Sequence, residues 1–442
     1  MSSDDEPSGA GQDPFAAMFG GIDPTQMGAA FTQIGAMLSY EGAVNWKLAS
    51  DTAHSTLAEH ADPAVSDADR AAVDEALRLA ELWLDPVTVF PAGGSTPAAW
   101  NRTAWIDATL EGWKVLVEPL ATRAGEQMGT MLPAQMPGEV AAMAGPLAGM
   151  FRQLGGAMFG MQLGQGLAQL AQDVLGSADV GVPLTTAGAT ALLPTNIAAF
   201  GEGLDVPADE VRLYVALREA AHQRLFAHAP WLRGRVAAAV EDYARGMQVD
   251  TSALEQAMGS VDLSNPEAVQ SALSSGMFEP ADTEEQAAAL ARLETLLALV
   301  EGWVDAVVAH AASSLPSAER LRETVRRRRA TGGPAEQTFA TLVGLELRPR
   351  RLREASALWE ALREHRGIDG RDAVWEHPDL LPSVDDLDDV DTFVHRTELD
   401  LSALESLEGP APTEPTIPRS GTDAAAGTPD SGPDDGPDDP TS

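Results

Sequence analysis

Residues 211–232 read VRLYVALREAAHQRLFAHAPWL, and this stretch decides the fold. Pro207 is well suited to the first position of a helix, and the acidic Asp209 and Glu210 favour a first turn because the positive end of the helix dipole attracts them. Pro230 cannot continue a helix. The sequence therefore predicts one helix that ends at about His228.

Three chemically reactive side chains lie close together on this predicted helix. At about 100° per residue, Arg218 and His222 lie in the middle of the apolar face, and Glu219 lies at its edge. A permanent charge inside a buried stripe is costly unless it is paired. Arg218 therefore needs an anionic partner. The apolar face comprises Val211, Tyr214, Val215, Leu225 and Phe226.

A second predicted helix supplies carboxylates. Asp282 is expected to cap it, and the acidic residues that follow favour its first turn. Glu301 lies within its apolar stripe, and Asp305 lies one turn on at the edge. We expect the two helices to pack face to face, because this would bring Arg218 against Glu301. The stripe comprises Leu290, Leu293, Leu297, Val300, Val304 and Val308.

Glu219 and His222 also match the last two named positions of His-Glu-x-x-His. In that motif two histidines one helical turn apart bind Zn²⁺, and the glutamate activates a metal-bound water. Arg218 stands where the first histidine would be, and a guanidinium cannot ligate a metal. The sequence leads to the hypothesis that Arg218 takes the place of the metal and pairs with Glu301.

Several motifs together resemble the bacterial zincin-like type 2 family, whose members are labelled zinc-dependent metalloproteases or hydrolases. The resemblance extends over nearly the whole chain between its two ends. It rests on Arg218–Leu232, Val44-Asn45-Trp46, Leu193-Pro194-Thr195-Asn196-Ile197, Val300-Glu301-Gly302-Trp303 and Val374-Trp375-Glu376-His377-Pro378. The resemblance implies a compact multi-helix zincin-like body.

The resemblance also implies roles for individual residues. Glu219 matches the general base, His222 the second metal ligand and Glu301 the third. Asp305 matches the residue that supports a ligand histidine. Zinc is accordingly the cofactor that the resemblance suggests.

Arg218 departs from the family pattern. It leaves two protein ligands, whereas catalytic zinc normally has three. His228 cannot substitute, because it lies about 240° further round the helix than His222. Trp303, next to Glu301, is a candidate for lining the cleft.

Two functions of different classes remain open at this point. One is a peptide-bond hydrolase with an unusual site, and the other is a non-catalytic binding or scaffold protein on the same frame. A di-iron bundle is a weaker alternative, because it needs a second Glu-x-x-His motif and two further glutamates.

The composition restricts which partners the protein is expected to bind and in which cellular compartment it is expected. The chain of 442 residues has a formal net charge of −38 and no cysteine. This charge disfavours nucleic acid backbones and anionic lipid surfaces, and the absence of cysteine excludes disulfides and cysteine-ligated zinc. The first residues lack the features of a signal peptide. We therefore expect a cytoplasmic protein that acts on a peptide substrate or a protein partner, without membrane or nucleic acid.

Apolar residues that recur three and four apart predict a mainly α fold. Residues 1–23 and the acidic tail 410–442 are expected to be disordered, with one helical domain over 24–409 between them. At most one small β-hairpin is expected, from Val180–Leu184 and Thr190–Leu193. Further helical patterns are Met27–Leu38, Ala71–Leu84, Trp100–Val117 and Leu352–Leu362.

Two other segments stand out. Pro146–Leu175 contains glycines at helical spacing, which predicts a central helix pair in close backbone contact; a cofactor cradle is the alternative. Arginines cluster between Arg320 and Arg371. We expect them to pair with the acidic run Asp385–Asp391 or with the tail, and a polyanion site is the alternative.

Overall fold

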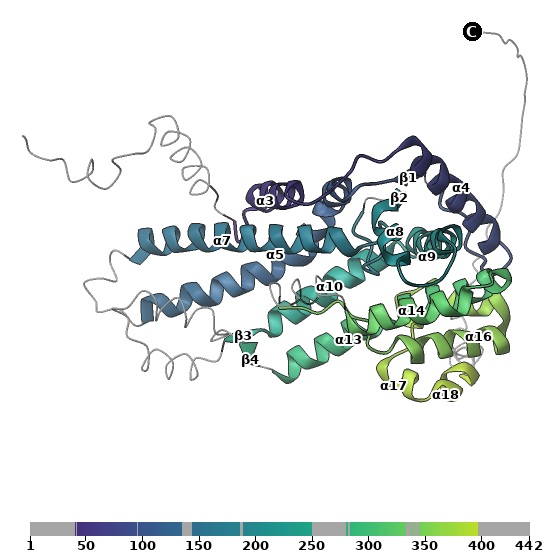
Figure 1. Cartoon of the computed structure of the whole chain (residues 1–442). Helices are drawn as coiled ribbons and strands as arrows, with labels where there is room; N and C mark the ends of the chain where they lie inside the picture. The colour runs from purple at the N-terminus through teal and green to yellow at the C-terminus, as the bar shows by residue number, and fades with distance from the viewer. Residues whose placement is uncertain are drawn as a thin grey trace, which may run out of the picture. The chain divides into compact units, whose positions relative to one another are not determined.

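The computed structural model describes residues 40, 42–94, 96–134, 144–185, 189–249, 280–281, 283–332, 337, 340 and 344–396 (Figure 1). The predicted mainly α fold is confirmed, because helices dominate these residues. The described residues up to His395 form one compact body. Both predicted disordered ends and the predicted Met27–Leu38 helix lie outside the described residues.

The elements follow one another in an almost uninterrupted series of helices. They are α3 (Trp46–Ala58), α4 (Asp67–Leu84), β1 (Thr96–Ala99), α5 (Arg102–Ala134), α7 (Ala144–Asp173), β2 (Ala189–Leu192), α8 (Pro194–Gly201), α9 (Ala208–His228), α10 (Trp231–Gly246), β3 (Gln248–Val249), β4 (Pro280–Ala281), α13 (Glu284–Ala311), η1 (Ala312–Ser314), α14 (Ala318–Thr331), α16 (Leu352–Asp372), η2 (Ala373–Trp375), η3 (Pro378–Leu380), α17 (Val384–Asp388) and α18 (Val390–His395).

The predicted helix in residues 211–228 is α9, and it lies deep in the core. It ends at His228 as predicted, and Pro207 is its N-cap rather than its first residue. Every residue from Leu213 to His222 is buried. The amphipathic pattern predicted one buried face, but more of the helix is buried, because α4, α8, α13, α14 and β2 all pack around it.

The second predicted helix is α13, which packs against α9, α10 and α16. Thr283 rather than Asp282 caps it, since its hydroxyl accepts a hydrogen bond from Gln286 N at 3.0 Å. The segment Glu284–Ser314 is long and apolar enough to cross a membrane, but 89% of its apolar window is buried inside the protein. This is the pattern of a core helix.

The predicted hairpin is wrong. Residues of the second predicted strand form β2, but β2 pairs in parallel with β1, with Thr96 opposite Ala189 and Ala99 opposite Leu192. Val180–Leu184 has no strand structure. Strand β1, which is far from β2 in the sequence, pairs with β2 in place of Val180–Leu184. Local sequence patterns cannot predict a pairing between such distant segments. The other pair, β3 with β4, is antiparallel.

The glycine-rich segment is the single helix α7, which lies along α3 and α5 (Figure 1). A Cβ at Gly160 would lie 2.6 Å from Asn45 O, and one at Gly164 would lie 2.3 Å from Ala49 O. The expected close backbone approach is therefore present. The central position is wrong, since Leu154 and Met158 on α7 are about half exposed.

Candidate functional site

Arg218 on α9 and Glu301 on α13 form a buried ion pair. Arg218 Nη2 donates to Glu301 Oε2 at 2.6 Å. Arg218 is 6% exposed and Glu301 is fully buried. The packing of α9 against α13 brings together the two side chains that the helical patterns placed on facing stripes.

Two further groups complete the surroundings of the Glu301 carboxylate. His222 Nε2 lies 3.2 Å from Oε1, and Arg329 Nη2 donates to the same oxygen at 3.2 Å. His222 Nδ1 faces the carbonyl of Arg218 at 2.8 Å, so this nitrogen must carry the hydrogen. Burial alone would raise the pKa of Glu301, but the guanidiniums of Arg329 and Arg218 outweigh it and hold that pKa well below its usual range.

Glu219 is bound to a different part of the structure. Its carboxylate accepts hydrogen bonds from Ser177 Oγ, from Ala178 N at 3.0 Å and from Gln223 Nε2 at 3.0 Å. Strand β2 positions Ser177, whose N–H donates to Ala191 O at 2.9 Å. Burial raises the pKa of Glu219, and these hydrogen bonds oppose the rise only in part.

Asp305 lies at the centre of a second group of arginines. It accepts from Arg322 Nη2 at 2.7 Å, from Arg326 Nη2 at 2.6 Å and from Ser356 Oγ at 2.7 Å. Burial raises the pKa of Asp305, but these arginines lower it by more, so it stays below its usual range. The described partners of Asp305 are thus arginines and a serine, and His222 is not among them.

Trp303 and His228 lie outside the Arg218–Glu301 cluster. Trp303 is fully buried and its Nε1 donates to Asp372 Oδ1 at 2.9 Å. His228 is exposed and stacks on Phe90, with ring centroids 4.4 Å apart. Both side chains therefore belong to the packing of α9, α13 and α16 around Phe90.

Arg327 and Arg328 of α14 form ion pairs with acidic residues outside the run 385–391. Arg328 pairs with Asp179 at 2.8 Å and Arg327 with Glu323 at 2.9 Å. The expected pairing with the acidic run is therefore wrong for Arg327 and Arg328, because α14 lies against α9 and α13. It holds for Arg351, which pairs with Asp388. The tail, the other expected partner, lies outside the described residues.

Sequence reasoning missed Arg329 and Ser177. A helical signal for Arg329 exists, since Leu321, Val325 and Arg329 recur every four residues and all three are buried. No comparable local signal marks Ser177, because the Ala189–Leu192 strand places it beside α9.

The chemistry of the donor set decides whether zinc fits. His222 Nε2 and Glu301 Oε1 are 3.2 Å apart and are the two metal-ligating atoms of the cluster. Among the described residues no group of three His, Cys, Asp or Glu side chains converges. Both oxygens of Glu301 already accept from guanidiniums. A zinc ion needs three protein ligands and would meet two cations here, so the described residues do not fit it.

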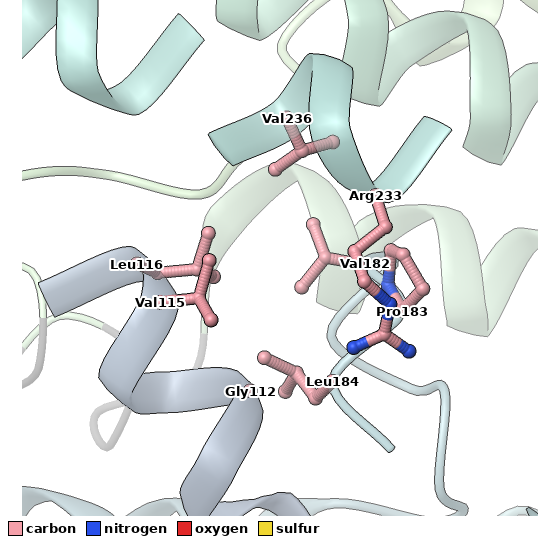
Figure 2. Close-up of a pocket in the computed structure, with 8 residues that line it drawn as sticks. All are labelled: Gly112, Val115, Leu116, Val182, Pro183, Leu184, Arg233 and Val236. Atoms are coloured by element: carbon pink, nitrogen blue, oxygen red, sulfur yellow. The ribbon is translucent and has the colours of Figure 1, made fainter. Parts of the chain in front are cut away.

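A small, partly open pocket lies elsewhere, between α5, α10 and residues 182–184 (Figure 2). Apolar side chains such as Leu116 and Val236 line it, and Arg233 stands at its edge. Arg233 donates to Thr185 O, and burial lowers the pKa of Arg233. None of the predicted site residues lines this pocket.

The buried Arg218-Glu219-x-x-His222 segment thus faces Glu301 inside a helical body. The chain belongs to the zincin-like metallopeptidase family, whose model matches residues 44–394. No curated protein shows significant similarity to it.

A solved structure shares the fold. It is the crystal structure of a "putative hydrolase with a novel fold" from Chloroflexus aurantiacus. The match has a TM-score of 0.55 and 22% sequence identity, and it covers 79% of this chain and 97% of that one. At this identity the likeness establishes the fold alone.

Proposed function

We propose that this chain is a zincin-like family member in which a guanidinium has replaced the metal, and that it works as a non-catalytic binding or scaffold protein. The observation that carries the proposal is the 2.6 Å bond from Arg218 Nη2 to Glu301 Oε2 inside the core. A permanent cation on the carboxylate of a ligand residue excludes a metal by charge and by space.

Access to the cluster supports the same conclusion. Arg218, Glu219, His222 and Glu301 are each at most 6% exposed. A peptide bond must reach the reacting groups before it can be hydrolysed. Glu219 accepts hydrogen bonds from Ser177 and Ala178. Neither of these groups could polarise a water molecule as a metal ion would. These contacts favour a structural role for residues that are catalytic in a complete zincin site.

The partner that fits this proposal is a peptide or another protein. The net charge of −38 disfavours nucleic acid and anionic membranes as partners. A cytoplasmic location is part of the same proposal. A hydrolase that uses Glu219 and His222 with an atypical ligand set is the competing function.

Metal analysis of the purified full chain tests the proposal. We expect substoichiometric zinc in the natural protein and in Arg218→Met. We expect about one equivalent in Arg218→His, because that variant offers two histidines and Glu301 as three ligands. Arg218→Met is the matched control, since it removes the guanidinium without adding a ligand.

One result would reject the proposal directly. Stoichiometric zinc in the natural protein that disappears in His222→Ala would show that the metal site is intact. Zinc in Arg218→His that persists after His222→Ala would show that the new site lies elsewhere, and it would also count against the proposed replacement.

A further inference from the structure

One face of α7 carries a stripe of exposed apolar side chains. Leu154, Met158 and Met161 recur three and four residues apart and are 49%, 51% and 38% exposed. Helices α3 and α5 lie along other sides of α7 (Figure 1). An exposed apolar stripe of this kind on a folded protein indicates a surface that binds another segment or another protein.

This face of α7 also lacks charge. No charged residue stands between Arg152 and Asp173, although the chain has a net charge of −38. Gln165 and Gln169 continue the exposed face beyond Met161. Carboxylates placed on such a surface would lose hydration without gaining a cation. The segment that fits this face is therefore apolar and uncharged.

The start of the described chain lies against the same part of α7. Asn45 N donates to Gly156 O at 3.0 Å, and a Cβ at Gly156 would lie 2.9 Å from Gly42 O. Gly156 stands midway between Leu154 and Met158 along the helix, about 200° round it from Met158. The residues that precede Gly42 thus begin level with the stripe, on the opposite side of α7.

These residues can reach the stripe. The chain from Leu38 to Gly42 can span about 13 Å. The diameter of a helix with its side chains is about 10–12 Å. A segment that ends at Leu38 can therefore pass round α7 to the exposed face.

The sequence of residues 27–38 has the composition that this face requires. Met27, Phe31, Ile34 and Leu38 recur three and four residues apart, and no charged residue stands between Asp23 and Glu41. A helix over these residues would be about 18 Å long, whereas Leu154 and Met161 are about 10 Å apart along α7.

The segment that follows the described body at its other end fits less well. Its leucines, between Leu399 and Leu407, are interspersed with acidic residues. The charge of the stripe therefore favours the segment before α3 over the segment after α18.

We propose that residues 27–38 bind the exposed stripe of α7 as an amphipathic helix. Apolar anchors three and four residues apart are the usual means by which such a helix binds an apolar surface. Burial of Leu154, Met158 and Met161 against Phe31 and Ile34 supplies the favourable free energy. This inference is independent of the proposed function, because its test involves neither Arg218 nor zinc.

Cross-linking of the full chain tests the inference. The natural chain has no cysteine, so two introduced cysteines are the only thiols. Ile34→Cys is combined with Met158→Cys, and the dilute protein is treated with a short bismaleimide. We expect a cross-link within one chain to form about tenfold faster than in the control pair, because binding raises the local concentration of one thiol at the other.

Ile34→Cys with Lys47→Cys is the matched control pair. Lys47 lies in the first turn of α3, and its side chain is 81% exposed. It is five residues from Gly42 in the sequence, so a segment that does not bind α7 would reach it as readily as Met158. Its greater exposure favours the control reaction, which makes the comparison stringent.

Phe31→Asp, added to the Ile34–Met158 pair, separates binding from mere proximity. We expect the cross-linking rate to fall to that of the control pair, since a carboxylate on the apolar face opposes binding. Equal rates in the two pairs, or a rate that Phe31→Asp leaves unchanged, would overturn the inference. Cross-links that join two chains would show that a second copy covers the stripe, and they would overturn it as well.

Discussion

Two buried carboxylates on neighbouring elements show how differently charge can be placed in one core. Asp372 accepts from Trp303 Nε1, Arg371 Nε, Thr88 Oγ1 and Val89 N, all within 3.0 Å. These four bonds use the capacity of the carboxylate in full. Arg371 is the adjacent residue, and its guanidinium also lies over the Trp303 ring.

Glu301 has a different environment. Three cationic or potentially cationic side chains from α9 and α14 approach it, and one of their donors, Arg329 Nε, is buried without a described acceptor. The Asp372 cluster joins α13, α16 and the loop after α4 as a structural tie. Each cluster keeps one buried guanidinium nitrogen without a described acceptor, Arg371 Nη1 in one and Arg329 Nε in the other. The comparison teaches that the two sites differ in how many cationic groups share one carboxylate, not in unsatisfied donors.

The largest expected effect comes from removing each carboxylate. Glu301→Gln leaves Arg218 and Arg329 without a counter-charge, so the free energy of unfolding should fall by about 3–5 kcal/mol. Asp372→Asn should cost less, about 1–3 kcal/mol, because Arg371 keeps the Val87 carbonyl and the Trp303 ring. Urea unfolding followed by tryptophan fluorescence measures both. If Glu301→Gln lost no more stability than Asp372→Asn, the distinction between the Glu301 and Asp372 clusters would be contradicted.

A smaller effect is expected at Gly181, which lies against the Glu301 cluster. Its φ is +83°, and an added Cβ would lie 2.6 Å from Glu301 Oε1 and 2.9 Å from Arg329 Nη2. Gly203 is the matched control, since its φ is +74° and an added Cβ meets nothing within 4 Å. Gly181→Ala should therefore destabilise by about 1–3 kcal/mol more than Gly203→Ala. Thermal unfolding compares the two variants. Equal losses of stability would show that Glu301 and Arg329 move aside at no cost.

The smallest effect concerns pH. The folded pKa values of Glu301, Asp305 and Asp179 are lowered, mainly by arginines that overcome burial. Their stabilisation is present above the ordinary carboxyl pKa and is lost as the pH falls below it. Glu219 has the opposite sign: its pKa is raised above 4.5, so its contribution is full below pH 4.5 and is lost as the pH rises through the folded value.

Glu219→Gln isolates this second contribution. In the natural chain, stability should decline above pH 4.5 by about 1.4 kcal/mol for each unit by which the pKa is raised. The variant should lack this decline and keep the loss in acid. Urea midpoints between pH 4.5 and 8 provide the measurement. A decline of the same size in both proteins would mean that Glu219 is not its source.

Much of the site could be read from periodicity. The spacing of Arg218 and His222 placed both on a buried stripe, and the spacing of apolar residues around Glu301 did the same for a second helix. Requiring a partner for each buried charge then linked the two. Trp303 shows the limit, since a neighbour in sequence on a helix points about 100° away per residue and here reaches Asp372 instead of the cluster.

The sequence by itself determined the helical class, the α9 and α13 helices and the identity of the first ion pair, because helical spacing and the cost of unpaired buried charge are local or pairwise rules. Only the tertiary structure decided that β2 pairs with β1, that Ser177 binds Glu219 and that Arg329 joins Glu301. Such contacts join segments far apart in the chain. Which of these contacts form depends on how the whole core packs, and the sequence of a single segment does not determine that packing.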